Sequence, residues 1–292
     1  MLLETPDKIK TTKMHYANRS AVFWLLLISG ANALHAQERE DVHPYLTETF
    51  FIDLGVFFPD RDTRLGVDGI ITGENDDFEF AQATGVQEDD ETFSMDFGWR
   101  FGKKWSVLGQ YFKSSGATGA VLTEDVEWKD VVFAQGSNAV VGQEFSVTRL
   151  FFGREFDSSA RHDFGAGLGI HQLKFRAFIQ GEILVAGGPN EFRAEAVSHD
   201  QPLPNIGIWY KYSMSPRWVL RSRLDWLDAS IDKYDGSLIN FSVGVNYKMS
   251  NNFGVGLNYN LVELDAAINE ADWRGRIVQR LDGAFVYASA YW

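Results

Sequence analysis

Charged side chains recur at every second position of several apolar segments in this chain. Arg221, Arg223 and Asp225 form the sharpest group, because a spacing of two residues stacks them about 7 Å apart on one face of a β-strand. Such a ladder can bind an anion, or it can pair with carboxylates of other strands, for which Asp53 and Asp96 are the candidates. A buried charge without a partner is costly, so the pattern favours pairing.

The same alternation places further ionisable residues on the polar face of other segments. The full set of candidates is Asp53, Asp96, Arg100, Arg149, Glu155, Asp163, His171, Lys211, Arg221, Arg223, Asp225 and Lys248. Bases and acids are nearly balanced in this set, which suits a lumen that is filled by its own ion pairs. A narrow, solute-selective pore lined by the same groups is the functional alternative.

Strict alternation of apolar and polar residues indicates β-strands for the elements that carry these groups. In Phe93–Phe101 the odd positions are apolar and the even positions are polar or Gly, and Phe253–Leu261 repeats the pattern. About ten such segments predict an all-β, closed, antiparallel barrel that crosses a membrane in up-and-down order. A soluble periplasmic ligand-binding barrel would show the same alternation.

Two features favour the membrane barrel. The polar face carries many glycines, which inside a narrow barrel make room for long neighbouring side chains. Large aromatic residues gather at strand ends, as in the girdles of membrane barrels. The rim near the short turns would carry Trp105, Trp218, Phe253, Phe101, Phe156, Tyr212 and Trp292, and the opposite rim would carry Phe58, Tyr111, Trp226 and Leu261.

Short turns alternate with long polar connections, as expected when one rim faces the periplasm and the other faces outward. The predicted strands are 46–58, 92–101, 105–113, 144–156, 161–175, 203–214, 218–228, 237–249, 253–265 and 276–292. The count is about ten, with a range of eight to twelve. A further hairpin of 63–67 against 78–82 would either lengthen two strands above the membrane or raise the count to twelve.

The N-terminal region reads as a secretory signal peptide at residues 1–36. A short apolar core at 21–28 follows Arg19 and precedes small residues, with cleavage expected after Ala36 or Ala33. Met14 is the alternative start, because residues 1–13 are polar. Residues 37–45 then form a short periplasmic segment, and 46–292 form the barrel.

Charge limits the partners. Removal of residues 1–36 leaves 23 Lys or Arg against 38 acids, a net charge of −15, so nucleic acid is not expected as a partner. Loop 59–91 alone carries eleven acids. A solvated loop accounts for them, and a divalent-cation site is the weaker alternative because the EF-hand spacing is missing. We predict no metal site and no cofactor. The chain has no Cys, which fits either a reducing compartment or an exported protein without disulfides and does not distinguish the two.

Only four histidines follow the predicted leader: His43, His162, His171 and His199. A protease or lipid hydrolase would need one of them beside a carboxylate or Ser at the outer rim. His171 is the candidate, with Asp228 and Asp265 expected nearby on other strands. We predict that the chain is not an enzyme, with this hydrolase as the alternative.

The C-terminal segment resembles the last strand of Gram-negative outer-membrane β-barrel proteins. Ala284, Val286, Ala288, Ala290 and Trp292 alternate up to an aromatic final residue, although that class usually ends in Phe. The resemblance implies that Trp292 is part of the signal read by the barrel assembly machinery. Over residues 46–292 the chain resembles small outer-membrane barrels of the OmpA-like and OmpW-like kind.

This resemblance implies a location in the outer membrane, with membrane lipid and lipopolysaccharide as partners. The expected function is structural or surface-interacting, or a narrow pore for small solutes. Omptin proteases are similar in strand number, but no stretch here matches their paired-acid and Asp-His pattern. The sequence leaves the substrate, the extracellular partners and the oligomeric state open.

Overall fold

The computed structural model describes residues 42–67, 78–79, 91–102, 104–122, 125–128, 131–158, 161–183, 191–231, 234–269 and 274–292. The predicted leader 1–36, with its cleavage site, lies outside these residues, as does most of the acidic part of loop 59–91. Within the described residues no helix has the length and apolarity needed to cross a membrane.

Antiparallel strands account for nearly all of the described chain. After a short 3-10 helix, η1 (Pro44–Leu46), the strands are β1 (Phe50–Val67), β2 (Phe78–Glu79), β3 (Thr92–Phe101), β4 (Trp105–Val121), β5 (Val126–Trp128), β6 (Val131–Phe133), β7 (Asn138–Ser158), β8 (His162–Ile183), β9 (Glu191–Ser213), β10 (Trp218–Ile231), β11 (Tyr234–Lys248), β12 (Phe253–Asn269) and β13 (Arg274–Tyr291).

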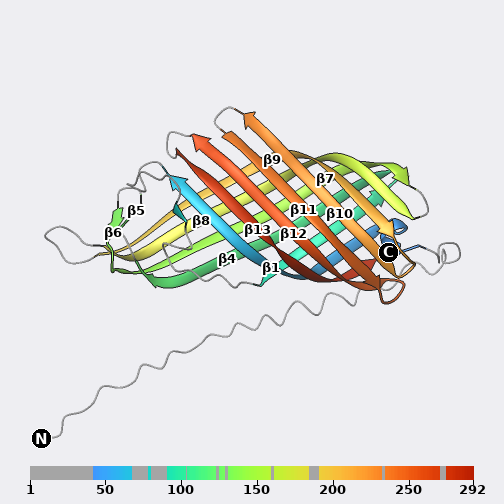
Figure 1. The fold of residues 1–292 in the computed structure, drawn as a ribbon, viewed down its shortest axis with the longest axis horizontal. Helices are drawn as coiled ribbons and strands as arrows, with labels where there is room; N and C mark the ends of the chain where they lie inside the picture. Colours follow the sequence, from blue (N-terminus) through green and yellow to red (C-terminus); the bar gives the residue numbers. More distant parts are fainter. Residues whose placement is uncertain are drawn as a thin grey trace, which may run out of the picture. The chain divides into compact units, whose positions relative to one another are not determined.

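Ten long strands pair with their neighbours and close into a barrel (Figure 1). The ladder runs from β13 back through β12, β11, β10, β9, β8, β7, β4 and β3 to β1. β1 then pairs with β13 from Phe51↔Tyr291 to Val67↔Gly275, which removes the open edge. The prediction of a closed, antiparallel, up-and-down barrel of about ten strands is confirmed.

The additional hairpin proposed for 63–67 and 78–82 exists in part. β2 pairs with β1 through Arg64↔Glu79 and Leu65↔Phe78, above the part of β1 that pairs with β3. It therefore lengthens the wall of the barrel locally and leaves the number of long strands at ten.

Near the short turns, apolar side chains point outward and polar side chains point into the barrel, as the alternation predicts. On β12, Leu257 is 51% exposed on the outside, whereas Asn258 is 2% exposed on the inside. Large apolar side chains are exposed on the outside of nine of the ten long strands, and those of β11 are partly exposed. A soluble protein rarely exposes so large a continuous apolar surface to water. The run from Phe253 to Leu261 is about 26 Å long at ~3.3 Å per residue, of the same order as the ~25 Å apolar band of outer-membrane barrels.

Farther along the strands, the polarity of the two faces reverses. On β12 the outward series changes from Leu257, Tyr259 and Leu261 to Glu263 and Asp265, while the inward positions become Val262 and Leu264, both buried. The outward face also becomes acidic at Asp60 on β1 and Asp282 on β13, which lie opposite each other in the seam ladder. Outward charges and a buried apolar interior are typical of a β-sheet in water. The reversal therefore marks the outer boundary of the membrane.

This reversal explains why the predicted strands are too short at their outer ends. β9, for example, begins at Glu191 rather than 203, and β8 continues to Ile183 rather than 175. The sequence interpretation assigned these polar stretches to loops, but they are the water-exposed continuation of the strands. The predicted first strand is also wrong at its start, because Pro44–Leu46 is a 3-10 helix and β1 begins at Phe50.

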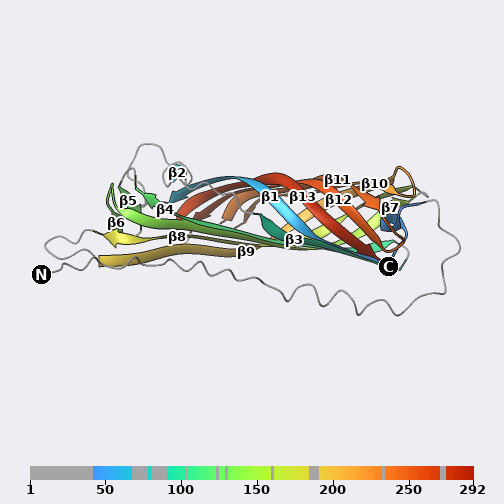
Figure 2. The same cartoon turned by 90° about the horizontal axis from the view of Figure 1, so that it is seen from below.

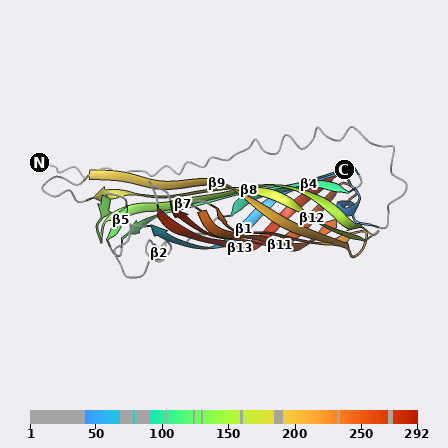
Figure 3. The same ribbon diagram turned by 90° about the horizontal axis from the view of Figure 1, so that it is seen from above.

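Four neighbouring strands, β4, β7, β8 and β9, form a sheet extension beyond the membrane boundary (Figures 2 and 3). β8 and β9 pair as far as Ile183↔Glu191, whereas β9 pairs with β10 only up to Trp226↔Ile206. Pro202 and Pro204 lie just beyond this last pair, toward the outer end of β9. Proline has no backbone N–H to donate to β10. The small hairpin β5–β6 packs on the inner side, where Phe133 is completely buried.

Aromatic rings line the outside of the barrel beside the short turns. Neighbouring rings contact one another across the seam in the order Trp292, Phe50, Trp99 and Phe101, with centroids 5.0–5.8 Å apart. Phe152 continues the series to Trp105, at 6.0 and 5.0 Å. This is the arrangement of a girdle at a membrane interface. Trp292 joins it and also closes the seam, since its backbone exchanges two hydrogen bonds with Phe50, at 2.8 and 3.0 Å.

A charge introduced into the outward face should reveal the position of the membrane. Leu257→Arg places a cation in the middle of the apolar band, and we expect the free energy of unfolding in phospholipid vesicles to fall by about 2–4 kcal/mol. Ala267→Arg, outward on the same strand but beyond the reversal, is the matched control and should change it by less than about 0.5 kcal/mol. Denaturant titration measures both values. Equal losses would show that the boundary is misplaced.

Candidate functional site in the lumen

Most of the predicted lumen residues lie inside the barrel in its membrane-spanning part. Eight of the twelve are less than 9% exposed: Asp53, Asp96, Arg149, Glu155, Asp163, His171, Lys211 and Asp225. Arg100, Arg221, Arg223 and Lys248 are partly buried. The interior is therefore polar on the short-turn side, while the outer side holds the apolar cluster around Phe145, Phe175 and Phe285.

The chain segment that precedes β1 enters the short-turn end of the lumen. We call residues 43–48 the plug. His43 and Tyr45, on either side of Pro44, have stacked rings with centroids 5.4 Å apart, and both side chains are almost completely buried. The backbone N–H of His43 donates to Ser213 Oγ at 3.0 Å, which ties the plug to the end of β9. The sequence interpretation left 37–45 outside the barrel as a periplasmic segment and did not foresee this insertion.

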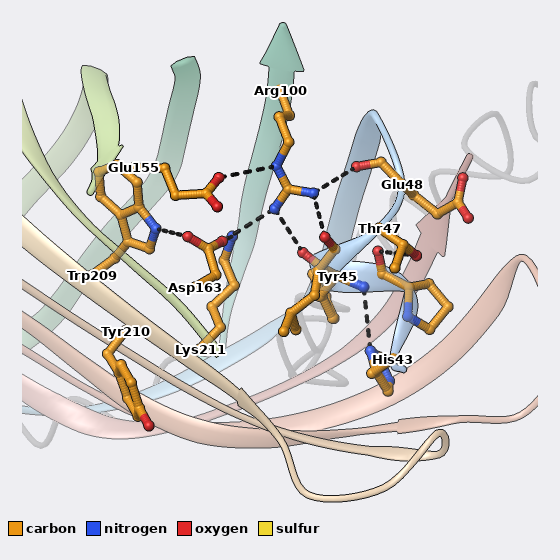
Figure 4. A network of polar contacts seen from close by, with 12 residues as sticks. His43, Tyr45, Thr47, Glu48, Arg100, Glu155, Asp163, Trp209, Tyr210 and Lys211 are labelled. Atoms are coloured by element: carbon orange, nitrogen blue, oxygen red, sulfur yellow. Dashed lines mark hydrogen bonds and ion pairs between the residues drawn. The ribbon is translucent and has the colours of Figure 1, made fainter. Parts of the chain in front are cut away.

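Arg100 holds the plug through its backbone (Figure 4). Its guanidinium donates to the carbonyl oxygens of Leu46 at 2.7 Å, Tyr45 at 3.3 Å and Glu48 at 3.4 Å. The same guanidinium donates to Asp163 Oδ2 at 3.1 Å. Since a 3-10 helix of three residues leaves most of its carbonyls without partners, Arg100 supplies the hydrogen bonds that fix this segment.

Asp163 receives three donors and joins the plug to the opposite wall (Figure 4). Lys211 Nζ and Trp209 Nε1 donate to it at 2.8 and 2.9 Å, in addition to Arg100. The indole of Trp209 is seated over Gly153 and Gly165, where any Cβ would collide with the ring. Glycine on the inward face thus makes room for a large inward ring, as the composition of that face suggests.

Arg221 and Asp53 form the second anchor of the plug. Their closest N···O distance is 2.7 Å, and Asp53 also accepts a short hydrogen bond from the Tyr45 hydroxyl. The guanidinium lies over the Tyr45 ring at 4.1 Å from the centroid, which adds a cation–π contact. The sequence offered Asp53 and Asp96 as partners, and the structure pairs Arg221 with Asp53.

The centre of the lumen is crossed by an ion pair with no exposure to solvent. Arg149 on β7 meets Asp225 on β10 with N···O distances of 2.6 and 2.7 Å, and both side chains are 0% exposed. Arg223 approaches the same carboxylate at 3.3 Å and donates to Gln110 Oε1 at 2.8 Å. These contacts connect β10 with β7 and β4, which lie three and four places away around the barrel, across its interior.

His171 belongs to this central network through neutral partners. Its Nε2 accepts from Asn240 Nδ2 at 2.9 Å, and its Nδ1 donates to Asn205 Oδ1 at 3.1 Å. This pattern corresponds to the neutral imidazole. The prediction that Asp228 and Asp265 lie near His171 is wrong, because Asp228 is exposed on the outward face and Asp265 is paired outside with Arg276 at 2.6 Å.

Asp96 borders a small cavity of about 40 Å³. Arg221, Arg223, Lys211 and Asn258 also line it. Oδ1 of Asp96 is buried without a hydrogen-bond partner among the described residues, so a few water molecules are the occupants that fit this space. No group of three or more His, Asp or Glu in the described part of the chain is placed to hold a metal ion.

Sequence reasoning missed several members of the network. Tyr45, Gln110, Asn205, Trp209 and Asn240 each contact a predicted lumen residue. Trp209 shares the inward face of β9 with Lys211, so the same alternation could have identified it. Tyr45 carried no such signal, because a three-residue helix has no periodicity.

His43 is the titratable group of the plug. Burial, the Arg221 guanidinium and the Lys248 ammonium together lower the pKa of His43 to about 3. Its imidazole is therefore neutral over the whole physiological range. Protonation would place a cation between Arg221 and Lys248 inside the barrel, which is unfavourable.

The arrangement in the described residues combines an apolar outside, a closed strand ladder and an ion-paired interior. A search of protein-family models finds no match, and a search of curated proteins finds none either. Among solved structures, the outer membrane protease OmpT from Escherichia coli superposes with a TM-score of 0.53 at 12% identity, over 83% of this chain and 96% of that one. The chain has the fold of an outer-membrane β-barrel.

Two further solved structures superpose with lower scores than OmpT. The toluene transporter TodX of Pseudomonas putida gives a TM-score of 0.33 at 9% identity, over 86% of this chain and 92% of that one. Ail, the attachment invasion locus protein of Yersinia pestis, gives 0.31 at 11% identity, over 83% and 99%. TM-scores this low support no inference about this chain. The OmpT match, at 12% identity, supports the fold alone.

The central ion pair should respond strongly to the loss of one partner. Asp225→Asn leaves the Arg149 guanidinium buried without a counter-charge, and we expect the free energy of unfolding to fall by about 3–5 kcal/mol. The double variant Arg149→Met/Asp225→Leu should lose less than the sum of its two single variants. Asp200→Asn, at the exposed Lys174 pair, is the control and should cost under about 1 kcal/mol. A loss below about 1 kcal/mol in Asp225→Asn would contradict the assignment.

The plug should make stability depend on pH through His43. Because its pKa is about 3 in the folded barrel and about 6.5 when unfolded, the unfolded state binds the proton first as the pH falls. Stability from this group is complete above about pH 6.5 and decreases between pH 6.5 and 3, by about 2 kcal/mol at pH 5. His43→Gln should remove that part of the slope, measured by denaturant titration at several pH values, whereas His162→Gln should leave it. An unchanged slope in His43→Gln would refute this.

Proposed function

We propose that this protein is a closed, non-conducting barrel of the outer membrane that anchors its sheet extension at the cell surface for interaction with other molecules. The observation that carries the proposal is the solvent-free Arg149–Asp225 pair in the middle of the lumen. A channel needs a continuous polar path, and this pair with its neighbours occupies that path.

The levels on either side of this pair support the same interpretation. On the short-turn side, the plug fills the opening and is held by Arg100 and by Asp53. On the outer side, Phe112, Phe145 and Phe175 are 2–5% exposed within a packed apolar cluster. Hairpin β5–β6 adds Phe133 to that cluster. Three successive levels therefore obstruct the passage of solutes.

The sheet extension suits a role at the surface. β4, β7, β8 and β9 continue beyond the membrane boundary. Their outward face is mostly polar and small, with Phe192 and Val140 as exposed apolar residues, and four of its charges form exposed ion pairs, Lys113 with Glu144 and Lys174 with Asp200. The inner face packs on the apolar cluster, so the extension is fixed to the barrel. Rigid strands present a surface with little loss of conformational entropy on binding.

The hydrolase alternative is less well supported. His171 is 0% exposed, lies below the apolar cluster, and has asparagine amides as its partners. A general base needs access to substrate and usually an orienting carboxylate. We therefore propose that His171 is a structural residue, and that His171→Gln leaves any activity found for the protein unchanged.

Electrical recording tests the proposal. The mature protein inserted into planar lipid bilayers should show no stepwise single-channel current. Arg100→Ala, which removes one of the two anchors of the plug, should also stay silent because the Arg149–Asp225 level and the apolar cluster remain. Insertion is verified for both proteins by protease protection in vesicles. A reproducible conductance in the wild type would overturn the proposal, and one in Arg100→Ala alone would show that the plug is the barrier.

A further inference from the structure

Cations on the outward face have carboxylate partners at one membrane boundary but not at the other. At the outer boundary they have carboxylate partners on neighbouring strands: Lys113 with Glu144 at 3.0 Å, Lys174 with Asp200 at 3.1 Å, Arg276 with Asp265 at 2.6 Å and Arg280 with Glu263 at 3.9 Å. At the short-turn boundary, Lys104, Arg154 and Arg217 are exposed, and no carboxylate of the described residues lies within 4.0 Å of them.

Arg154 lies within the aromatic girdle itself. It points outward on β7 between Phe152 and Phe156, which are 48% and 58% exposed. Its ladder partners are Trp105 on β4 and Ala166 on β8, and its guanidinium lies 5.5 Å from the centroid of the Trp105 ring. Ala166 is small, and Arg154 is exposed. Lys104 immediately precedes Trp105 in the chain.

Arg217 repeats this combination at another turn. It donates to the Tyr247 hydroxyl at 3.3 Å, and the Tyr247 ring contacts Trp218 at 4.9 Å between centroids. Each place thus combines a cation with rings that lie at the interface between hydrocarbon and headgroups. A cation at this depth is partly withdrawn from water and favours a nearby anion.

We propose that these two places bind the phosphate groups of anionic glycerophospholipid in the membrane leaflet on the short-turn side. A guanidinium matches a phosphate in geometry and can bind it through two hydrogen bonds. Short turns face the periplasm in barrels of this kind, so the lipid concerned is phospholipid and not the lipopolysaccharide of the opposite leaflet. The net charge of the whole chain is −13, so general attraction of the protein to anionic lipid does not explain such binding.

Quenching of tryptophan fluorescence by brominated lipid tests the proposal. The full mature protein is placed in phosphatidylcholine vesicles that contain brominated phosphatidylglycerol or brominated phosphatidylcholine, and the ratio of the two association constants is determined. Each interfacial cation contributes about 1 kcal/mol, or about a fivefold preference. We expect the wild type to prefer phosphatidylglycerol by at least about fivefold. The variant K104Q/R154Q/R217Q should show a ratio near one.

The matched control is K113Q/R276Q/R280Q, which removes three cations at the opposite boundary and should retain the wild-type ratio. Circular dichroism verifies that both variants are folded. If K104Q/R154Q/R217Q does not fold, the wild-type ratio is measured at about 0.05 and 0.5 M salt, where it should fall towards one. A wild-type ratio near one, an unchanged ratio in K104Q/R154Q/R217Q, an equal loss in the control, or a ratio insensitive to salt would overturn the proposal. Competition by inorganic phosphate at millimolar concentration would show a phosphate site without lipid specificity and would overturn it too.

Discussion

The structure depends on the absence of water around its strands. Hydrocarbon cannot satisfy a backbone N–H or a side-chain charge, so the ladder must close and every ionised group within the band must find its partner inside. Pairing of β1 with β13 meets the first requirement, and contacts such as Arg149–Asp225 meet the second. The interior is thus a consequence of the surroundings of the barrel, and its charges cross-link the strands from inside.

This constraint ends at the outer membrane boundary, and the strands change character there. Beyond Leu261 on β12 the outside becomes charged and the inside apolar, and beyond Phe58 on β1 the outside becomes charged as well. The barrel is therefore two kinds of β-structure in series, one organised for lipid and one for water. Both share the same strands and hydrogen-bond register, so the sheet extension is continuous with the part within the membrane.

Sequence patterns were sufficient for the part of the fold in which apolar side chains alternate outward and polar side chains inward. Alternation in Phe93–Phe101 and Phe253–Leu261 predicted direction correctly, and short turns such as Ser215–Arg217 fixed the hairpin ends. The outer ends of β8 and β9 could not be found in this way, because alternation with reversed polarity looks like a polar loop. Spacing also gives the face of a strand but not distances across the lumen. Arg221 could therefore be placed inside, while the choice between Asp53 and Asp96 needed coordinates.

The plug has a consequence for the order in which this molecule can assemble. Tyr45 contacts Ser289, 244 residues later in the chain, and Phe50 bonds to Trp292. These two contacts cannot form until the last strand has arrived, so the bonding of the plug and of the start of β1 is completed last. Closure of the seam therefore completes the assembly of the barrel. A change near either end of the chain should disturb contacts made by the other end.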